Sequence, residues 1–436
     1  MSVRADTMQD METGDVKDAA QPFPAVNRWQ VGLTCAAIVA AGYLVAWLVH
    51  EPEPTDRAES SYVTPPVAFP VRIPGCDVVE PPREGQTFGM MYSGTDSYDN
   101  PSYPWFSGPK AGAMTQALHD GLPGDVEIVF APVTRSLVFQ PILGDATQNK
   151  GFDGWSEARA TLLRADREGA LAVTVRQSTK PIRPCVAGEL DERRHLPDGT
   201  IVDTQDTWYE MKGVRTLTRD ATAYLPDGSV VHANATDHAA EGSGRTRAVP
   251  LSIDELVALV TDPGLRISAP VPPGTPRPPE VCLRFWKSGA VIDQAQARRW
   301  DEVLAQIPLD GVTLDRPLGA LLQGERGGGV CQVVRVTTLG WQSRLAVVIS
   351  TEQPLPQEPD TSSYDGATRR LPDGTAVETR EVRSAALSST PRTDRTVTVT
   401  HPSGTQIKIS FDDAPAELLP LALLEQIALN PGLDVS

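Results

Sequence analysis

The chain lacks the short motifs that mark common hydrolytic and metal-dependent active sites. Only six of its 436 residues are histidines, and none forms the H-E-x-x-H spacing of a zinc protease. No G-x-S-x-G serine motif is present, and the glycines at 327–329 lack the lysine of a phosphate-binding loop. We therefore assign no catalytic, metal-binding or cofactor-binding residue and expect no enzyme activity defined by such a motif.

Basic residues are scarce relative to acidic ones. The chain has 39 Lys and Arg against 56 Asp and Glu, a formal net charge of −17. Such a chain, without a basic patch, is a poor binder of nucleic acid and of anionic lipid heads, so we expect no nucleic-acid partner. Calcium binding is also disfavoured, because Asp237, Asp412 and Asp413 do not form a closely spaced ligand loop.

Cysteine is rare, and no two cysteines form the C-x-x-C spacing of a zinc or redox motif. One of the five, Cys35, lies inside an apolar run. The other four are an even number, which favours disulfides in an oxidising compartment and allows three pairings. These four are Cys76, Cys185, Cys282 and Cys331.

One apolar run is long enough to cross a membrane. Residues 31–49, VGLTCAAIVAAGYLVAWLV, carry no charge, and a helix of that length spans roughly 28 Å, close to the ~30 Å hydrocarbon core. Trp29 and Trp47 lie near its two ends, as interfacial aromatic residues do. The acidic leader and the absence of an A-x-A site argue against a cleaved signal. We predict a retained transmembrane helix over residues 28–50, with membrane lipid as its partner.

Orientation follows from the basic residues near the predicted span. Lys17 and Arg28 precede it, whereas the first basic residue after it is Arg57. Because Lys and Arg favour the cytoplasmic side, we predict a single-pass protein of the plasma membrane with a disordered cytoplasmic tail, residues 1–27. The remaining domains are then extracytoplasmic.

The exported part contains two copies of one unit. Residues 196–204, LPDGTIVDT, return as residues 371–379, LPDGTAVET, and the ending DPGLRIS at 262–268 matches NPGLDVS at 430–436. Between the copies, six of the eleven residues at 269–279 are proline, which favours a semi-rigid extended spacer. We predict a proline-rich stalk at 51–74, a first domain at 75–268, a linker at 269–280 and a second domain at 281–436.

Each copy combines strand and helix patterns. Alternating apolar residues on both sides of 166–169 predict a hairpin, which has a counterpart over 330–349. Ser252 and Glu255 form a capping box before an apolar stripe, and further helices are expected at 111–119 and 291–306. We predict an α+β fold: a transmembrane helix followed by two homologous domains, each an antiparallel sheet of five or six strands with one or two packed helices.

The duplication favours one of the three cysteine pairings. Cys76 and Cys282 both begin a repeat, while Cys185 and Cys331 fall at the same end of the predicted hairpin. We therefore predict the bonds Cys76–Cys185 and Cys282–Cys331, as one structural crosslink used twice.

Two groups of residues have enzyme-like or metal-like spacing. The S-x-x-K at 107–110 and the K-S-G at 287–289 resemble elements of penicillin-interacting serine enzymes. They occupy corresponding places at the heads of the two copies, so we interpret them as helix entries. His232 and His238 with Asp237 could meet a metal, but a solvated strand and loop is the favoured interpretation.

The LPDGT turn, the strand after it and the ending PLSIDELVALVTDPGL at 250–265 are similar to those of a group of uncharacterised actinobacterial membrane-anchored proteins. The resemblance implies a short tail, one span and an exported domain in the cell envelope. It implies no activity.

We therefore expect a membrane-anchored binding, sensing or interaction protein of the bacterial cell envelope, whose partner is an envelope protein or ligand. The alternative is an envelope hydrolase or transferase with scattered active-site residues, and a purely structural role is a third class. A concave pocket with converging ionisable groups would favour the enzyme, whereas an exposed apolar patch or open sheet edge would favour partner binding.

Overall fold

The computed structural model describes residues 69–82, 97–142, 154–211, 213–238, 246–282, 289–309, 311–325, 327–338, 341–356, 366–384, 392–414 and 419–435. The predicted tail, the predicted span and most of the predicted stalk lie outside these ranges. Within them, no helix combines the length and the apolar character needed to cross a bilayer.

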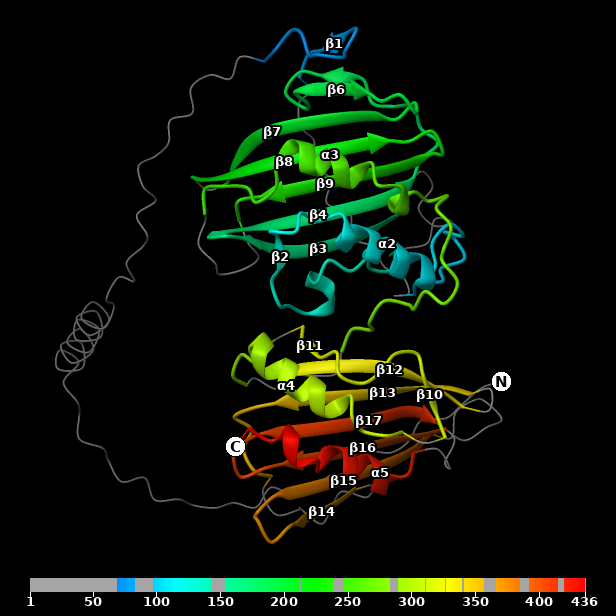
Figure 1. The fold of residues 1–436 in the computed structure, drawn as a ribbon, viewed down its shortest axis with the longest axis vertical. Coiled ribbons are helices and arrows are strands. Elements are labelled where there is room, and N and C mark those ends of the chain that lie inside the picture. Colours follow the sequence, from blue (N-terminus) through cyan, green and yellow to red (C-terminus); the bar gives the residue numbers. More distant parts are fainter. Residues whose placement is uncertain are drawn as a thin grey trace, which may run out of the picture. The chain divides into compact units, whose positions relative to one another are not determined.

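The first repeat is built around an antiparallel sheet of seven strands in the order β2-β3-β4-β9-β8-β7-β6 (Figure 1). The pairing of β4 with β9 joins an N-terminal hairpin to a C-terminal meander. The strands are β2 Glu127–Ile128, β3 Trp155–Arg164, β4 Arg167–Gln177, β6 Glu192–His195, β7 Ile201–Met211, β8 Val214–Tyr224 and β9 Ser229–Thr236.

The second repeat follows the same path. Its order is β10-β12-β13-β17-β16-β15-β14, and one extra short strand, β11, also pairs with β12. The strands are β10 Thr313–Leu314, β11 Leu322–Gln323, β12 Val330–Thr338, β13 Trp341–Ser350, β14 Gly366–Arg370, β15 Ala376–Ser384, β16 Arg392–Thr400 and β17 Gln406–Ala414.

The α+β class and the two antiparallel sheets agree with the prediction, but the expected five or six strands per sheet is too few. The additional strands are the short outer ones. β2, β10 and β11 have two residues each and β6 has four, which is too short for alternation to distinguish a strand from a loop. Sequence patterns therefore identify the long strands and miss the edges.

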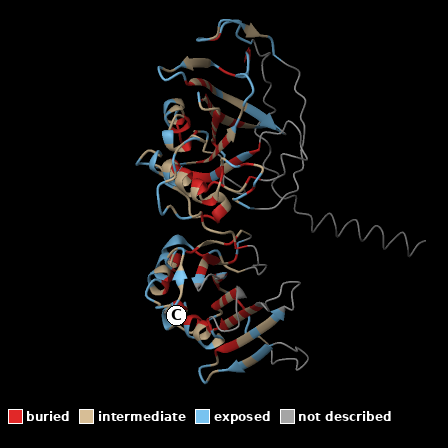
Figure 2. Ribbon diagram, turned by 90° about the vertical axis from the view of Figure 1, so that its right-hand side faces the viewer, coloured by how far each residue is buried: buried red, intermediate tan, exposed pale blue. Residues whose placement is uncertain are grey.

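Two helices cover one face of each sheet. The first repeat uses α2 (Gly108–Asp120) and α3 (Ile253–Val260), and the second uses α4 (Gln294–Leu304) and α5 (Leu421–Ala428) (Figure 1). Met114 and Leu256 from the helices join one core with the strands, and Trp300 and Leu424 join another. Figure 2 shows buried residues, in red, on both the helices and the strands.

The repeated turns form for the same physical reason in both copies. Asp198 accepts a hydrogen bond from the backbone N–H of Thr200 at 3.0 Å, as Asp373 does from Thr375 at 2.9 Å. These backbone hydrogen bonds hold the pKa of both carboxyls below the usual range. In the first turn, Gly199 lies between Asp198 and Thr200 and has φ +85°, a conformation that favours glycine.

Each repeat closes on a matching contact. The ending of the first repeat donates from the backbone N–H of Ile267 to Ser229 Oγ at 2.9 Å. The ending of the second donates from Val435 to Thr405 Oγ1 at 3.1 Å. Both hydroxyl residues are almost fully buried and follow the glycine of a repeated turn. The end of each copy is therefore tied to the start of its last strand.

Candidate functional site

The four predicted cysteines form two disulfides in the structure. Cys76 bonds to Cys185 across 109 residues of chain, and Cys282 bonds to Cys331 across 49. Closing loops of this length stabilises a fold by about 4 to 5 kcal/mol in the chain-entropy account.

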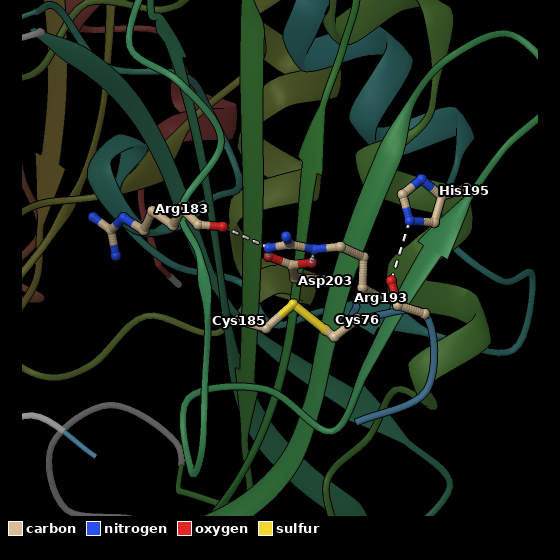
Figure 3. The surroundings of a disulfide bond; sticks show 7 residues. Cys76, Arg183, Cys185, Arg193, His195 and Asp203 are labelled. Atoms are coloured by element: carbon tan, nitrogen blue, oxygen red, sulfur yellow. Dashed lines mark hydrogen bonds and ion pairs between the residues drawn. A yellow bond between two sulfur atoms is a disulfide. The ribbon is translucent and has the colours of Figure 1, made fainter. Parts of the chain in front are cut away.

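The two bonds do not occupy equivalent positions, so the expectation of one crosslink used twice is wrong. Cys185 lies in β5 (Cys185–Val186), which pairs with β1 (Val79–Glu80) outside the main sheet and beside the β6 edge (Figure 3). Cys331 lies within β12, near the opposite edge. The reason is that the chain runs on past the end of β4 before it reaches Cys185.

Within the described residues, the S-x-x-K element at 107–110 has a structural role. Ser107 caps α2 by accepting from the backbone N–H of Lys110. Lys110 is buried, and its Nζ donates to the carbonyl oxygens of Arg266 and Ala269 at 2.6 and 2.7 Å. Burial lowers the pKa of Lys110 to about 8. This lysine therefore holds the end of the repeat, and Lys287 lies outside the described residues.

The residues with metal-like spacing, for which a solvated strand and loop is the favoured interpretation, bind other partners. Asp237 is buried and accepts from the backbone N–H of Leu217 at 2.9 Å, while His232 Nε2 lies 3.1 Å from Asp220. No cluster of three or more metal-binding side chains occurs among the residues that the structure describes.

The face of the first sheet opposite α2 and α3 is lined by polar side chains, and we call it the polar face. Val173 and Val231 belong to the helix-covered core, so strand alternation places Thr174 and His232 on the other face. The register aligns six polar residues in one row across six strands: Glu157, Thr174, His232, Thr222, Asp203 and Arg193.

A hydrogen-bond network organises the centre of this face. Asp220 Oδ1 accepts from His232 Nε2 at 3.1 Å and from Asn234 Nδ2 at 2.8 Å, and Asp220 Oδ2 accepts from Thr218 at 3.0 Å. Burial acts to raise the pKa of Asp220, but the hydrogen bonds from His232 and Asn234 outweigh it and keep this pKa below the usual range. An ionised Asp220 only accepts, so the proton on His232 lies on Nε2.

A cavity of about 660 Å³ opens at one end of the strands. One wall is residues 178–185, which follow β4 and which we call the strap. The strap is held at one end by the hydrogen bond from Ser178 N to Gly228 O and at the other by the Cys76–Cys185 disulfide. The lining is Trp155, Arg176, Ser178, Lys180, Pro181, Ile182, Arg183, Asp198, Gly199, Tyr224, Leu225, Pro226, Gly228, Ser229 and Val230.

The cavity combines apolar walls with positive charge. Trp155 and Ile182 are each 37% exposed, and Leu225 and Val230 are buried beneath them. Three cations line the space, Arg176, Lys180 and Arg183, against one carboxylate, Asp198, which pairs with Arg266 at 3.0 Å.

The pKa of Tyr224 is affected by the charges around the cavity. Burial and the nearby Asp203 raise the pKa of its phenol, while Arg183, Arg193 and Arg176 act in the opposite direction. Arg193 is already neutralised, because its Nε and Nη2 donate to the two oxygens of Asp203 at 2.6 and 2.8 Å (Figure 3). The other two arginines, Arg176 and Arg183, line the cavity.

Sequence analysis missed these residues because they come from four separate segments that meet only in the folded sheet. One signal was available: Thr174 and Arg176 alternate with Val173 and Val175, as polar residues do on a face of their own. Alternation identifies the face but gives no position for the strap.

The second repeat places different residues on the corresponding face. Its register matches that of the first: Val348 pairs with Lys408 as Thr174 pairs with His232. By the same correspondence, Thr396 stands where the first repeat has Asp220. Glu157, Arg176, Tyr224 and Asn234 correspond to Cys331, Ser350, Thr400 and Ser410.

Comparisons with known proteins add no function. No protein-family description matches the chain, and no curated protein matches it. Among solved structures, the di-domain ARO/CYC BexL from the BE-7585A biosynthetic pathway aligns at 12% identity over 69% of this chain and 90% of that one, with a TM-score of 0.11. A putative oleoyl thioesterase from Lactobacillus plantarum aligns at 11% identity over 71% and 84%, with a TM-score of 0.12. Likenesses this weak carry no argument about fold or function.

Proposed function

We propose that this chain is a membrane-anchored, extracytoplasmic binding or sensing protein of the bacterial cell envelope, and that its first repeat binds a small ligand. The observation that carries the proposal is the 660 Å³ cavity between the strap and the strand ends. Cavities of roughly 300 to 1,000 Å³ are typical of small-molecule sites.

The charge pattern of the cavity favours binding over catalysis. General acid–base catalysis needs a donor and an acceptor within reach of one reacting group. The cavity instead presents three cations and a carboxylate that is already paired with Arg266. Such groups orient a ligand of opposite charge.

The envelope location is supported by the two disulfides, which persist in oxidising compartments. It is also supported by the apolar run at 31–49 and by the resemblance to actinobacterial membrane-anchored proteins. The test is non-reducing peptide mapping of the membrane fraction from the native host, with surface protease accessibility scored on the same sample. Free thiols in a protease-protected domain would reverse the proposed orientation.

Ligand binding is tested by ligand-observed NMR with the full chain and a library of neutral, cationic and anionic small molecules. The variant Ile182→Trp fills the cavity from the strap. Leu355→Trp is the matched control, because Leu355 in the second repeat has the same 37% exposure. We expect binders that are lost with Ile182→Trp and kept with Leu355→Trp. A library with no binder sensitive to Ile182→Trp sinks the proposal.

The alternative, an envelope hydrolase or transferase, would depend on His232 and Asp220, which form a hydrogen-bonded pair on the polar face. The same NMR samples distinguish the two functions. A ligand that remains chemically unchanged over hours supports binding. Turnover that is lost in His232→Gln would favour the enzyme.

A further inference from the structure

We propose that the cavity of the first repeat selects a small amphipathic anion, a phosphate or carboxylate group joined to an apolar body. This inference rests on the proposed binding function and adds the chemical class of the ligand.

The anionic part is inferred from the charges on the cavity wall. Arg183 is exposed and makes no ion pair within the described part of the chain; its backbone oxygen, by contrast, accepts from Arg193 at 2.8 Å. Figure 3 shows its guanidinium directed away from the Cys76–Cys185 bond. Arg176 and Lys180 line the same space. A concave site with one sign of charge concentrates ligands of the other sign.

The positive charge of this site is opposite in sign to the net charge of the chain. The net charge of −17 repels anions over most of the surface, so a local excess of cations in a cavity is not a by-product of composition. A guanidinium also matches phosphate and carboxylate oxygens with its planar fork of N–H donors, and an ammonium attracts them as a point charge.

The apolar part is inferred from the remaining lining. Trp155 and Ile182 keep more than a third of their surface exposed at the mouth, and Pro181 and Pro226 add rigid apolar surface. An inorganic anion alone would leave this surface in water. A ligand that covers it gains hydrophobic free energy in addition to its charge contacts.

Arg183 reaches the cavity because the strap is fixed on both sides. Its backbone is two residues from Cys185 and accepts from Arg193, which is itself held by Asp203. The second repeat has Ser350 in place of Arg176, and its Cys331 lies in the sheet, so its disulfide does not hold a strap at this place. The selectivity should therefore belong to the first repeat alone.

The test measures the affinity of the full chain for four soluble probes: phenyl phosphate, phenylacetate, inorganic phosphate and benzylamine. We expect the two aromatic anions to bind more tightly than inorganic phosphate, and benzylamine to bind most weakly. Benzylamine binding as tightly as phenyl phosphate overturns the anionic part. Inorganic phosphate binding as tightly as phenyl phosphate overturns the apolar part.

Variants locate the site. Arg183→Gln should weaken phenyl phosphate binding by about tenfold, the effect of losing one charge-assisted hydrogen bond. Arg159→Gln is the control, because Arg159 is an exposed cation of the same sheet that does not line the cavity and pairs with Glu157 at 2.7 Å. Equal affinities for Arg183→Gln and the unaltered chain would contradict the proposal.

The same measurements distinguish the source of the anion. They also distinguish failure of the proposed ligand class from failure of the proposed binding function. Displacement of phenyl phosphate by monomeric dihexanoyl phosphatidic acid assigns the anion to a lipid, and no displacement assigns it to a free metabolite. Neutral ligands that bind in an Ile182-dependent way, without the anions, leave the binding function standing and overturn the ligand class. No cavity-dependent binding at all removes both.

Discussion

The two repeats have the same scaffold and different surfaces on the face opposite the helices. Strand order, the Asp-Gly turns and the closing contact to Ser229 or Thr405 are shared. The first repeat carries the Asp220 network and a charged cavity on that face, whereas the second places an apolar cluster around Cys331 there. The turns and closing contacts that specify the fold are therefore shared, whereas the residues on the face opposite the helices differ.

The second repeat has a cavity of its own, which sharpens this contrast. It measures about 540 Å³ and lies between α4 and α5, with residues such as Gln306, Ile307 and Leu423 in its lining. Among the described residues, no ionisable side chain lines it. The cavity lined by Arg176, Lys180 and Arg183 lies at the strand ends of the first repeat.

Removal of a disulfide should give the largest loss of unfolding free energy in either repeat. Removing either by paired Cys→Ser substitution should cost about 2 to 5 kcal/mol of unfolding free energy. By loop length alone the Cys76–Cys185 bond, which closes 109 residues against 49, should matter more by about 0.7 kcal/mol. Chemical denaturation of the full-length variants measures the difference. A larger loss at Cys282–Cys331 would show that location in the sheet outweighs loop length.

The same variants separate stability from binding. Loss of Cys76–Cys185 frees one end of the strap, so ligand affinity should fall at temperatures where the variant remains folded. Loss of Cys282–Cys331 should leave affinity unchanged. Equal effects on ligand affinity would mean that a fixed strap is not required for binding.

Lys110 should have the next largest effect. Lys110→Met keeps the apolar stem but leaves the carbonyl oxygens of Arg266 and Ala269 without their donor, and we expect a loss of about 1 to 3 kcal/mol. Urea unfolding checks the value. Lys180→Met, an exposed lysine of the strap, is the control for charge alone and should change stability by less than about 0.5 kcal/mol. A neutral result for Lys110→Met would indicate that the repeat ending needs no such support.

The closing contacts should have equal effects in the two repeats. Ser229→Ala and Thr405→Val each remove a buried hydroxyl that accepts from the repeat ending, so each should lose about 1 kcal/mol. Thermal unfolding of the single and double variants is the measurement. Losses that differ by much more than about 1 kcal/mol would show that the two closing contacts stabilise their repeats unequally despite their shared geometry.

The smallest expected difference between the repeats is in how their unfolding free energies decline as the pH is lowered. The folded-state pKa of Asp220 is lowered, so its contribution to stability is present above the unfolded pKa of about 4 and is lost as pH falls through the folded value. Asp220→Asn should therefore flatten the decline in unfolding free energy below about pH 4. Thr396→Asn, at the matching position of the second repeat, should leave the decline unchanged. Identical acid profiles for both variants would argue against the Asp220 network.

Some elements could be predicted because their causes are local. The capping box of Ser252 and Glu255 forms as expected, and the helices predicted at 111–119 and 291–306 appear at 108–120 and 294–304. The hairpin of β3 and β4 also follows from alternation near one turn. Each of these depends on residues within a single helix or a single hairpin.

Other features could not be predicted because their causes are distant in the chain. The pairing of Ala172 with Asn234 joins β4 to β9 across the whole meander, and no local pattern selects it over pairing with β6. The same pairing creates the row that contains Thr174 and His232. The strap, and with it the cavity, depends on where Cys76 ties the chain.

The amino-acid sequence by itself determined the duplication, the α+β class, the Asp-Gly turns and the candidate cysteines, because turns, caps and alternation act between near neighbours. Only the tertiary structure decided the strand order, the different locations of the two disulfides and the meeting of Trp155, Arg176 and Arg183 around one cavity. The physical reason is that strand pairing and burial join residues far apart in sequence, and their free energies depend on contacts that exist only in the folded chain.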